Sequence, residues 1–434
     1  MNKIEEKFPM EKELERDLIV SFLQDKKIFA SFYEDIDPDF FKDRNNEKMF
    51  KVFKIYFSKY KHLPSYNQTL NIISKLDKKI KNSDEFTEYT KSVYENPILS
   101  FHEIEYLNDQ IRIFIKRNKV KNAILESASL IDDPDKFMEI DSKIRQAILW
   151  KDNVSLGINI ANAEERYNRT QDMFTHIVPT HLPSLNNYLG KGFLNKTLTV
   201  FFAGSSVGKS IALDNFALYA YEQGFNVVMI TLEMSEEIKG LRIDASITKQ
   251  NLQSLIEKKD DAIKIWNSKS KDKTNKFFIK EYPSSSISTN HIENYLYKLE
   301  IYEDFKPDIL FVDYAGIMLP KSGNKNSLYE QGGAVMEDLR ALAINYNIPV
   351  VSADQLKRES INLGADQLDE SFVADSDRKR RNIDNGIIIA STPEERELGQ
   401  SRWKIIKNRN GEKDKIFSVS IDYEHFKFSQ KKLN

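Results

Sequence analysis

The segment AGSSVGKS, residues 203–210, has the composition of a phosphate-binding loop. Small residues let the backbone curl so that successive N–H groups face a phosphate, and the start of a following helix adds partial positive charge. In that arrangement Lys209 would reach the β- and γ-phosphates of a nucleotide, and the Ser210 hydroxyl would contact Mg²⁺. The expected nucleotide-binding residues are therefore Ala203, Gly204, Ser205, Ser206, Val207, Gly208, Lys209 and Ser210.

The setting of this segment favours the same interpretation. Residues 197–203, TLTVFFA, predict a buried strand directly before it, and residues 210–223 predict a helix that Gly224 ends. A strand–loop–helix context is what makes a P-loop motif specific. The first position is Ala203, where the usual pattern has glycine. A Gly/Ser turn that happens to end in Gly-Lys-Ser is the alternative, and the context disfavours it.

Two carboxylates follow predicted strands at positions where a nucleotide site needs them. Asp313 ends the apolar stretch DILFVDY, residues 308–314, and would hold the Mg²⁺ shell together with Ser210. Glu233 ends NVVMITL, residues 226–232, and a carboxylate at the carboxyl end of a parallel strand points into the nucleotide crevice. There Glu233 could orient or deprotonate water. The alternatives are that an aspartate often follows an apolar strand, and that Glu233 caps the helix beginning at SEEIKG.

The elements that must position these residues form an alternating series from about residue 181. Apolar strands separated by helices predict a mostly parallel sheet covered on both faces. Asn410-Gly411 indicates a hairpin-type turn between RWKIIKN and KIFSVSID, with a loop longer than two residues. The expected strands of the alternating series are residues 197–203, 226–232, 276–282, 308–314, 348–354 and 386–391.

The first part of the chain has a different hydrophobic pattern. Residues 10–150 are almost purely helical in pattern, with Val52, Phe53, Tyr56 and Phe57 on one apolar face. A lone amphipathic helix then presents Ile160, Ala163, Tyr167 and Phe174 on about one side, and this apolar stripe needs a partner surface. Because 434 residues exceed one core, we expect a helical N-terminal assembly domain (1–150), a linker with an amphipathic helix (151–180) and an ATPase domain (181–434).

Composition excludes several classes of site. The chain has no cysteine, which rules out disulfides, cysteine-based zinc sites and thiol nucleophiles, and its six histidines are scattered. With 64 basic and 66 acidic residues, a nucleic-acid site would have to be local. No signal-like or membrane-length apolar segment is present, so we expect a soluble, cytoplasmic protein.

Five segments together resemble DnaB-type replicative helicases. They are ITLEMSEE followed by Arg242, DILFVDYAGIM, DLRALAINYNIPVVSADQLKRE, IIKNRNGEKDKI, and the P-loop itself, whose leading alanine also occurs in the T-even phage branch of the family. The N-terminal half is similar more loosely. The resemblance implies a RecA-like ATPase fold, six-membered homo-oligomeric rings and a linker helix that docks on the next subunit. It also places Arg242 among the nucleotide-binding residues.

The resemblance implies further catalytic roles. Gln355 matches the glutamine that senses the γ-phosphate, and an amide can both donate to phosphate and accept elsewhere. Arg409 matches the arginine finger that completes the site of the adjacent subunit, and Lys407 matches its companion. The two lie two residues apart, so we expect them on the same side of a strand. An ordinary basic hairpin edge is the alternative for both.

The run DSDRKRRN, residues 375–382, contains the cations Arg378, Lys379, Arg380 and Arg381. Such a run can be a solvated surface loop or a nuclear-localisation signal. The resemblance instead places it in a loop that lines the central channel, between Val373 and Asp384, where the cations would bind DNA phosphates. Family members of the T-even type carry mostly small residues there.

These observations predict an α + α/β protein with a helical N-terminal domain, a linker helix and a RecA-like C-terminal P-loop ATPase domain. The expected function is that of a ring-forming replicative DNA helicase using ATP or another nucleoside triphosphate with Mg²⁺. The resemblance implies single-stranded or forked DNA as substrate, 5′→3′ translocation, a homo-hexamer, a primase and a helicase loader as partners, and a bacterial cytoplasm if the protein is phage-encoded. The alternatives are a RecA/RadA-type filament-forming ATPase and a non-catalytic, nucleotide-gated loader or scaffold.

Overall fold

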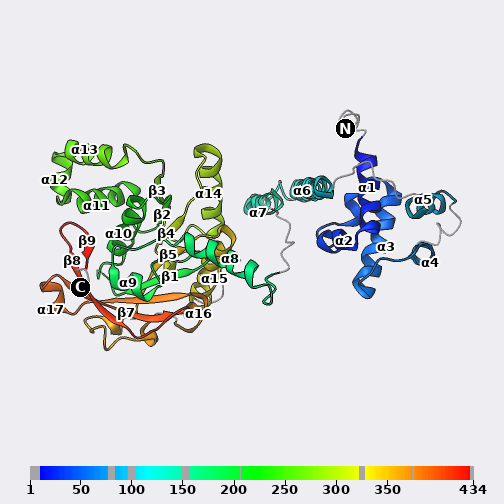
Figure 1. Cartoon of the computed structure of the whole chain (residues 1–434). Coiled ribbons are helices and arrows are strands. Elements are labelled where there is room, and N and C mark those ends of the chain that lie inside the picture. Colours follow the sequence, from blue (N-terminus) through cyan, green and yellow to red (C-terminus); the bar gives the residue numbers. More distant parts are fainter. Residues whose placement is uncertain are drawn as a thin grey trace. The chain divides into compact units, whose positions relative to one another are not determined.

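The computed structural model describes residues 10–76, 84–95, 104–148, 150, 157–205, 207–321, 328–373 and 376–430. By its internal contacts the chain divides into an N-terminal unit, residues 1–157, and a C-terminal unit, residues 158–434 (Figure 1). The division falls inside the segment predicted to be a linker, and the predicted amphipathic helix, α8 (Ala163–Thr175), belongs to the C-terminal unit.

The described residues of the N-terminal unit form helices joined by turns and loops, with no strand, as the sequence predicts. Asp43 begins α3 by accepting the backbone N–H groups of Asn45 and Asn46, which would otherwise lack partners at a helix start. Pro64 lies in the break between α3 and α4. The helices are α1 (Met10–Gln24), α2 (Lys26–Phe32), α3 (Arg44–Tyr60), α4 (Tyr66–Leu76), α5 (Asp84–Glu95), α6 (Ile104–Ala128) and α7 (Phe137–Ile148), with short turns η2 (Pro38–Phe40) and η4 (Pro134–Lys136).

Aromatic rings fill the core of this unit. Phe29 contacts Phe22, Phe50 and Phe53 with ring centroids 5.3–6.2 Å apart, mostly tilted or edge-on. The predicted apolar face of α3 is buried as expected, with Val52 and Phe53 fully inaccessible. Burying a large apolar side chain contributes about 1.5–3 kcal/mol, so this core supports the helices without a sheet.

The C-terminal unit is built around one nine-stranded sheet in the order β3-β2-β4-β5-β1-β6-β7-β8-β9. The first six strands in this order are parallel, and β7, β8 and β9 extend the sheet antiparallel. The six predicted strands and the hairpin are confirmed, whereas β9 has no counterpart in the prediction. The strands are β1 (Leu198–Ala203), β2 (Val227–Thr231), β3 (Phe277–Glu281), β4 (Ile309–Asp313), β5 (Val350–Gln355), β6 (Asn385–Ala390), β7 (Gln400–Asn408), β8 (Ile416–Asp422) and β9 (Lys427–Ser429).

Helices cover both faces of this sheet (Figure 1). Alternate residues of β1 enter different cores: Phe201 packs with Phe216 of α10 on one face, and Phe202 packs in the core that contains Leu339 of α15 on the other. The C-terminal helices besides α8 are α9 (Pro183–Tyr188), α10 (Lys209–Glu222), α11 (Glu236–Thr248), α12 (Leu252–Glu257), α13 (Lys259–Ser270), α14 (Thr289–Glu303), α15 (Leu328–Tyr346), α16 (Ser376–Asn382) and α17 (Pro393–Glu397), with turns η5 (Ala315–Ile317), η6 (Arg358–Ser360) and η7 (Glu370–Phe372).

The strand register gathers the chemically important residues. Ala203, at the end of β1, pairs with Gln355 at the end of β5, and Thr231, at the end of β2, pairs with Asp313 at the end of β4. The carboxyl ends of these four parallel strands therefore form one edge, which we call the carboxyl edge. Open α/β sheets bind ligands at this edge.

Candidate nucleotide-binding site

The predicted P-loop joins β1 to α10 at the carboxyl edge. Gly208 begins the helix with φ 105°, and a Cβ there would lie 3.0 Å from the Phe428 ring, so this position requires glycine. Among the described residues no side chain caps α10, which leaves the N–H groups of its first turn for a ligand. Ser206 lies outside the described residues. The helix start at Gly208 is therefore consistent with the predicted phosphate site.

Lys209 folds back over this loop. Its ammonium donates to the backbone oxygens of Gly204 at 3.0 Å and Ala203 at 3.3 Å, and the side chain is buried. Burial lowers the pKa of Lys209, while the charges of Glu233, Asp313 and Asp354 oppose this change. A desolvated ammonium near carboxylates, bound only to carbonyls, can exchange these contacts for phosphate oxygens.

Asp313 lies fully buried beside the first turn of α10. Its Oδ1 accepts the Ser210 hydroxyl at 3.2 Å. A carboxylate and a hydroxyl are hard oxygen donors, and Mg²⁺ typically uses one or two protein ligands together with phosphates and waters. The described residues contain no cluster of three or more His, Cys, Asp or Glu suited to a metal. The pair therefore fits Mg²⁺ delivered with a nucleotide rather than a self-sufficient metal cage.

Glu233 is exposed two residues after β2 ends. The helix that follows begins with Ser235, whose hydroxyl accepts the Ile238 N–H at 3.3 Å. Ser235 is therefore the cap of α11, and the capping role considered for Glu233 does not apply. Glu233 acts electrostatically on both Lys209 and Tyr314, which places its charge at the carboxyl edge.

Gln355 is the last residue of β5, and its side chain is exposed. Its amide donates to the Tyr314 hydroxyl at 3.2 Å, and its backbone N–H donates to Asp354 Oδ1 at 2.8 Å. Tyr314 directly follows Asp313. Gln355 is therefore connected on one side to the residue after the proposed metal ligand and on the other side to Asp354.

Arg242 projects from α11 toward the β8–β9 turn. Its guanidinium lies 4.9 Å from the ring centroid of Phe426, a cation–π distance. The Phe426 backbone oxygen accepts Asn215 of α10 at 2.8 Å. Arg242 thus contacts a residue that is hydrogen-bonded to α10. Its contact with nucleotide remains a prediction.

Lys407 and Arg409 lie at the other end of the central strands, around Asp384, which directly precedes β6. Asp384 Oδ1 pairs with Arg409 at 3.0 Å, and its Oδ2 pairs with Arg340 at 3.1 Å and accepts the Leu198 N–H at 3.0 Å. We call this region the amino edge. The Lys407 ammonium instead donates to the backbone oxygen of Arg380. Arg409 was expected on the strand with Lys407, but β7 ends at Asn408 and Arg409 begins the turn.

The predicted basic loop is a short helix, α16, packed against α15 (Figure 1). Lys379 departs from the expectation of a DNA contact, because its side chain is buried and its ammonium pairs with Asp354 at 2.7 Å. Gly332 of α15 makes room for it: a Cβ there would lie 2.3 Å from Lys379 Cε. Arg380 pairs with Glu370 at 2.7 Å, and Arg381 is exposed.

Two charged residues at the site escaped the sequence interpretation. Lys239 of α11 and Asp214 of α10 are buried, with Lys239 Nζ 2.6 Å from both Asp214 Oδ1 and Asp313 Oδ2. Burial raises the pKa of Asp214 to about 6, against the opposing effect of Lys239. The available signal was Asp214 itself, a carboxylate inside the mostly apolar stretch IALDNFALYA.

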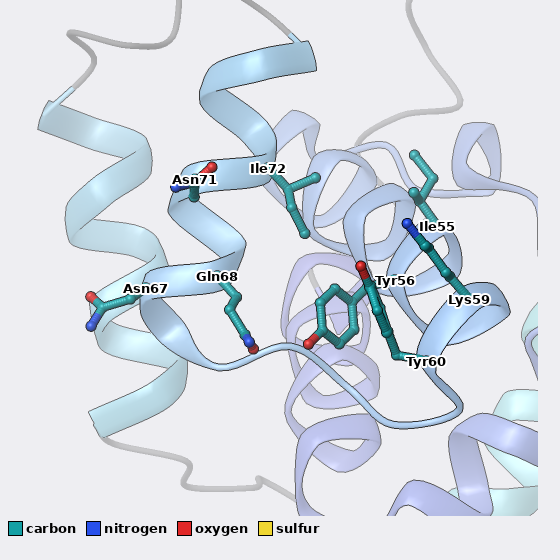
Figure 2. Close-up of a pocket in the computed structure, with 8 residues that line it drawn as sticks. All are labelled: Ile55, Tyr56, Lys59, Tyr60, Asn67, Gln68, Asn71 and Ile72. Carbon is teal, nitrogen blue, oxygen red and sulfur yellow. The ribbon is translucent and has the colours of Figure 1, made fainter.

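Two other surfaces carry no predicted chemistry. Figure 2 shows a pocket of about 410 Å³ in the N-terminal unit, where residues of α3 face residues of α4. Its lining contains tyrosine rings, amides, isoleucines and one lysine, but no carboxylate or histidine, so we assign it no reaction. On α8 and just before it, Ile160, Tyr167 and Phe174 are 75%, 64% and 54% exposed, so the predicted apolar stripe lies uncovered in the single chain.

Comparison with known proteins identifies the family of this chain. The family described as DnaB-like helicase C terminal domain matches residues 177–430. The chain is 26% identical over 412 residues to a DnaB-like replicative helicase of Enterobacteria phage T4, covering 90% of this chain and 85% of that protein. It is also 26% identical over 298 residues to the replicative DNA helicase DnaB of Helicobacter pylori strain 26695, covering 66% of this chain and 59% of that protein.

Solved structures show the same fold. A DnaB-like replicative helicase, described with its interactions with primase, aligns with a TM-score of 0.63 at 14% identity, covering 96% of this chain and 99% of that one. A second solved structure, an ATPase domain on its own, aligns with a TM-score of 0.53 at 17% identity, covering 64% of this chain and all of that domain. Among the described residues, no helix is long and apolar enough to cross a membrane. The family match spans more than half of the sequence and contains every predicted site residue, so the chain belongs to the DnaB-like helicase family.

Proposed function

We propose that this protein is a ring-forming replicative helicase that couples ATP hydrolysis between subunits to movement along single-stranded DNA. The observation that carries the proposal is the convergence of Lys209, Ser210, Asp313, Glu233 and Gln355 at one edge of one sheet. A P-loop ATPase needs a cation that binds the phosphates, a pair of ligands for the metal, a group that orients the attacking water and a residue that senses the γ-phosphate.

Each residue has a proposed task in the reaction. Lys209 leaves its carbonyl partners and binds the β- and γ-phosphates of ATP. Ser210 and Asp313 would hold Mg²⁺, which would neutralise charge on the phosphate oxygens. Glu233, exposed at the same edge, orients the attacking water and accepts its proton. Gln355 donates its amide to the γ-phosphate, in exchange for its contact with Tyr314.

The site is completed by a neighbouring subunit. Arg409 lies at the amino edge, where its side chain is 45% exposed, and we propose that it contacts the γ-phosphate bound by the next subunit, with Lys407 as its companion. The exposed stripe of α8 supplies a second surface for the same assembly, because an uncovered apolar helix face requires burial. Six such contacts close a ring in the proposed homo-hexamer.

DNA contact is assigned to the basic helix α16, with Arg381 as its leading cation. Arg378 and Arg380 are half-buried beside it. We do not propose Lys379 as a DNA contact, because its ammonium is buried and paired with Asp354. Phosphate contacts by a few cations per subunit add up around a ring even when the whole chain carries a net charge of −2. The proposed partners also include a primase and a helicase loader, and the proposed location is the cytoplasm of a bacterial cell.

An unwinding assay on forked duplexes of both polarities, with ATP and Mg²⁺, tests this function. We expect unwinding of forks that support 5′→3′ translocation. The Glu233→Gln variant should bind nucleotide but lose hydrolysis by a factor of about 10²–10⁴, and unwinding should stop with it. Glu237→Gln, an exposed change in the first turn of α11, is the matched control and should remain active. Absence of unwinding by the unaltered protein on either fork, or open filaments on DNA without closed rings, would contradict the proposal.

A further inference from the structure

A buried charged triad lies directly behind the proposed magnesium site. Lys239 is fully inaccessible, and its ammonium lies 2.6 Å from Asp214 Oδ1 and 2.6 Å from Asp313 Oδ2. The three residues come from three elements: α11, α10 and β4. Taking an ammonium out of water costs several kcal/mol unless close partners compensate it, so this lysine requires both carboxylates as partners.

The two oxygens of Asp313 have different partners. Oδ1 accepts the hydroxyl of Ser210, on the side where the P-loop helix begins, and Oδ2 faces Lys239. A carboxylate held by one partner can rotate about its last bond, whereas one held at both oxygens has a fixed plane. Oδ1 is therefore directed toward the position that Mg²⁺ would share with Ser210.

We propose that Lys239 is a positioning residue for Mg²⁺ binding, acting through the Asp313 carboxylate; this inference rests on the proposed nucleotide site. Asp214 serves Lys239 in turn, since its charge offsets that of the ammonium and fixes where the ammonium lies. Metal sites commonly depend on such partners behind the ligands, and their removal lowers metal affinity by about 10- to 100-fold.

The charges of the triad argue against a role of Lys239 in stability alone. Lys239 and Asp214 alone would form a neutral buried pair. The added contact with Asp313 gives the triad a net charge of −1, which is the charge that Asp313 would carry without the other two residues. Lys239 therefore changes the direction of the Asp313 carboxylate while leaving the total charge presented to Mg²⁺ unchanged, and this property can be tested separately from charge.

Two variants test the effect of Lys239 on the Asp313 carboxylate separately from its effect on folding. Asp214→Asn combined with Lys239→Met removes the contact with Asp313 without leaving an unpaired buried ammonium, and the net charge stays at −1. Asp214→Asn alone keeps the contact but raises that charge to 0, so it serves as the control for the loss of Asp214. The single Lys239→Met change would leave two buried carboxylates facing each other and is not suitable. The readout is binding of a fluorescent, non-hydrolysable ATP analogue across a Mg²⁺ titration, with a parallel measurement in EDTA.

The double variant keeps the net charge of −1 and should need about tenfold more Mg²⁺ for half-saturation than the unaltered protein, with the same affinity for the analogue in EDTA. Thermal melting of both variants reports any loss of fold. Equal Mg²⁺ dependence of the double variant and the unaltered protein, whatever their melting temperatures, overturns the positioning role. If the unaltered chain does not bind the analogue, the proposed nucleotide site itself is wrong. This outcome is distinguishable from loss of the positioning role because it is measured without any substitution.

Discussion

At the carboxyl edge of the C-terminal sheet, Lys209, Ser210 and Asp313 converge within one loop and two strand ends. At the amino edge, Asp384 instead holds Arg340 and Arg409 and anchors the N–H of Leu198, the first residue of β1. β1 has six residues, and a strand rises about 3.3 Å per residue, so the edges lie roughly 17 Å apart. That separation exceeds the reach of an arginine side chain.

Under the proposed function, one chain carries two incomplete halves of a site. The carboxyl edge has the groups that we propose bind nucleotide and activate water, but the predicted finger is not among them. The amino edge has the exposed guanidinium of Arg409, but no phosphate-binding loop. If the halves belong together, they must come from different subunits, which makes assembly a requirement of catalysis.

The largest expected effect comes from Arg409→Ala. It should lower ATP hydrolysis by a factor of about 10³, the lower end of the range for arginine fingers, while leaving nucleotide binding at the carboxyl edge intact. Arg340 still pairs with Asp384 in this variant, so the fold should persist. Steady-state hydrolysis and nucleotide titration measure the two properties. A parallel loss of nucleotide affinity would place Arg409 at its own P-loop and break the comparison.

A smaller effect concerns the docking of α16 on α15. A Cβ at Gly333 would lie 2.3 Å from Arg378 Cγ and 2.9 Å from its Cβ, close to the backbone of α16. Gly333→Ala should therefore destabilise the C-terminal unit by about 1–3 kcal/mol, although alanine favours helices. Gly240→Ala on α11, where no atom lies within 4 Å of the added Cβ, should stabilise by about 0.5–1 kcal/mol.

Urea unfolding of the two glycine variants checks these opposite signs. Hydrogen exchange in α16 should rise only in Gly333→Ala, and nucleotide binding should be unchanged in both. A stabilised Gly333→Ala protein would show that α16 does not rest against α15 in solution.

The sequence predicted the carboxyl edge well because its signals are local. The P-loop combines a left-handed Gly208 with a helix start, and the strands are continuous apolar runs because both faces of the sheet are covered. Glu233 and Asp313 could be placed because strand ends converge at one edge. These inferences need only the order of elements, which the chain itself supplies.

Burial of charge could not be predicted in the same way. Lys379 and Lys239 look like solvated cations in the sequence, and only the packing of other helices buries them against Asp354 and Asp214. Such pairs join segments 25 residues apart in each case. The exposure of Arg381 beside a buried Lys379 likewise depends on how α16 lies on Gly332, which no local pattern reports.

The smallest expected effect concerns the contribution of one α16 cation, Arg381, to DNA binding. Arg381→Ala should weaken single-stranded DNA binding a few-fold and reduce the slope of log affinity against log salt by about 1. Lys264→Ala, an exposed cation on α13, is the matched control and should leave the slope unchanged. Fluorescence anisotropy at several salt concentrations measures both. An unchanged slope for Arg381→Ala would remove this residue from the DNA surface.

The most direct test of the shared site mixes two inactive proteins. Lys209→Ala lacks the P-loop cation and Arg409→Ala lacks the finger, so neither alone should hydrolyse ATP at an appreciable rate. In randomly mixed rings, about a quarter of the interfaces would join an intact P-loop to an intact finger. We predict that mixing restores ATP hydrolysis toward that fraction of the unaltered rate. Hydrolysis that stays at the level of the separate variants, in rings shown to exchange subunits, would contradict a site built from both edges.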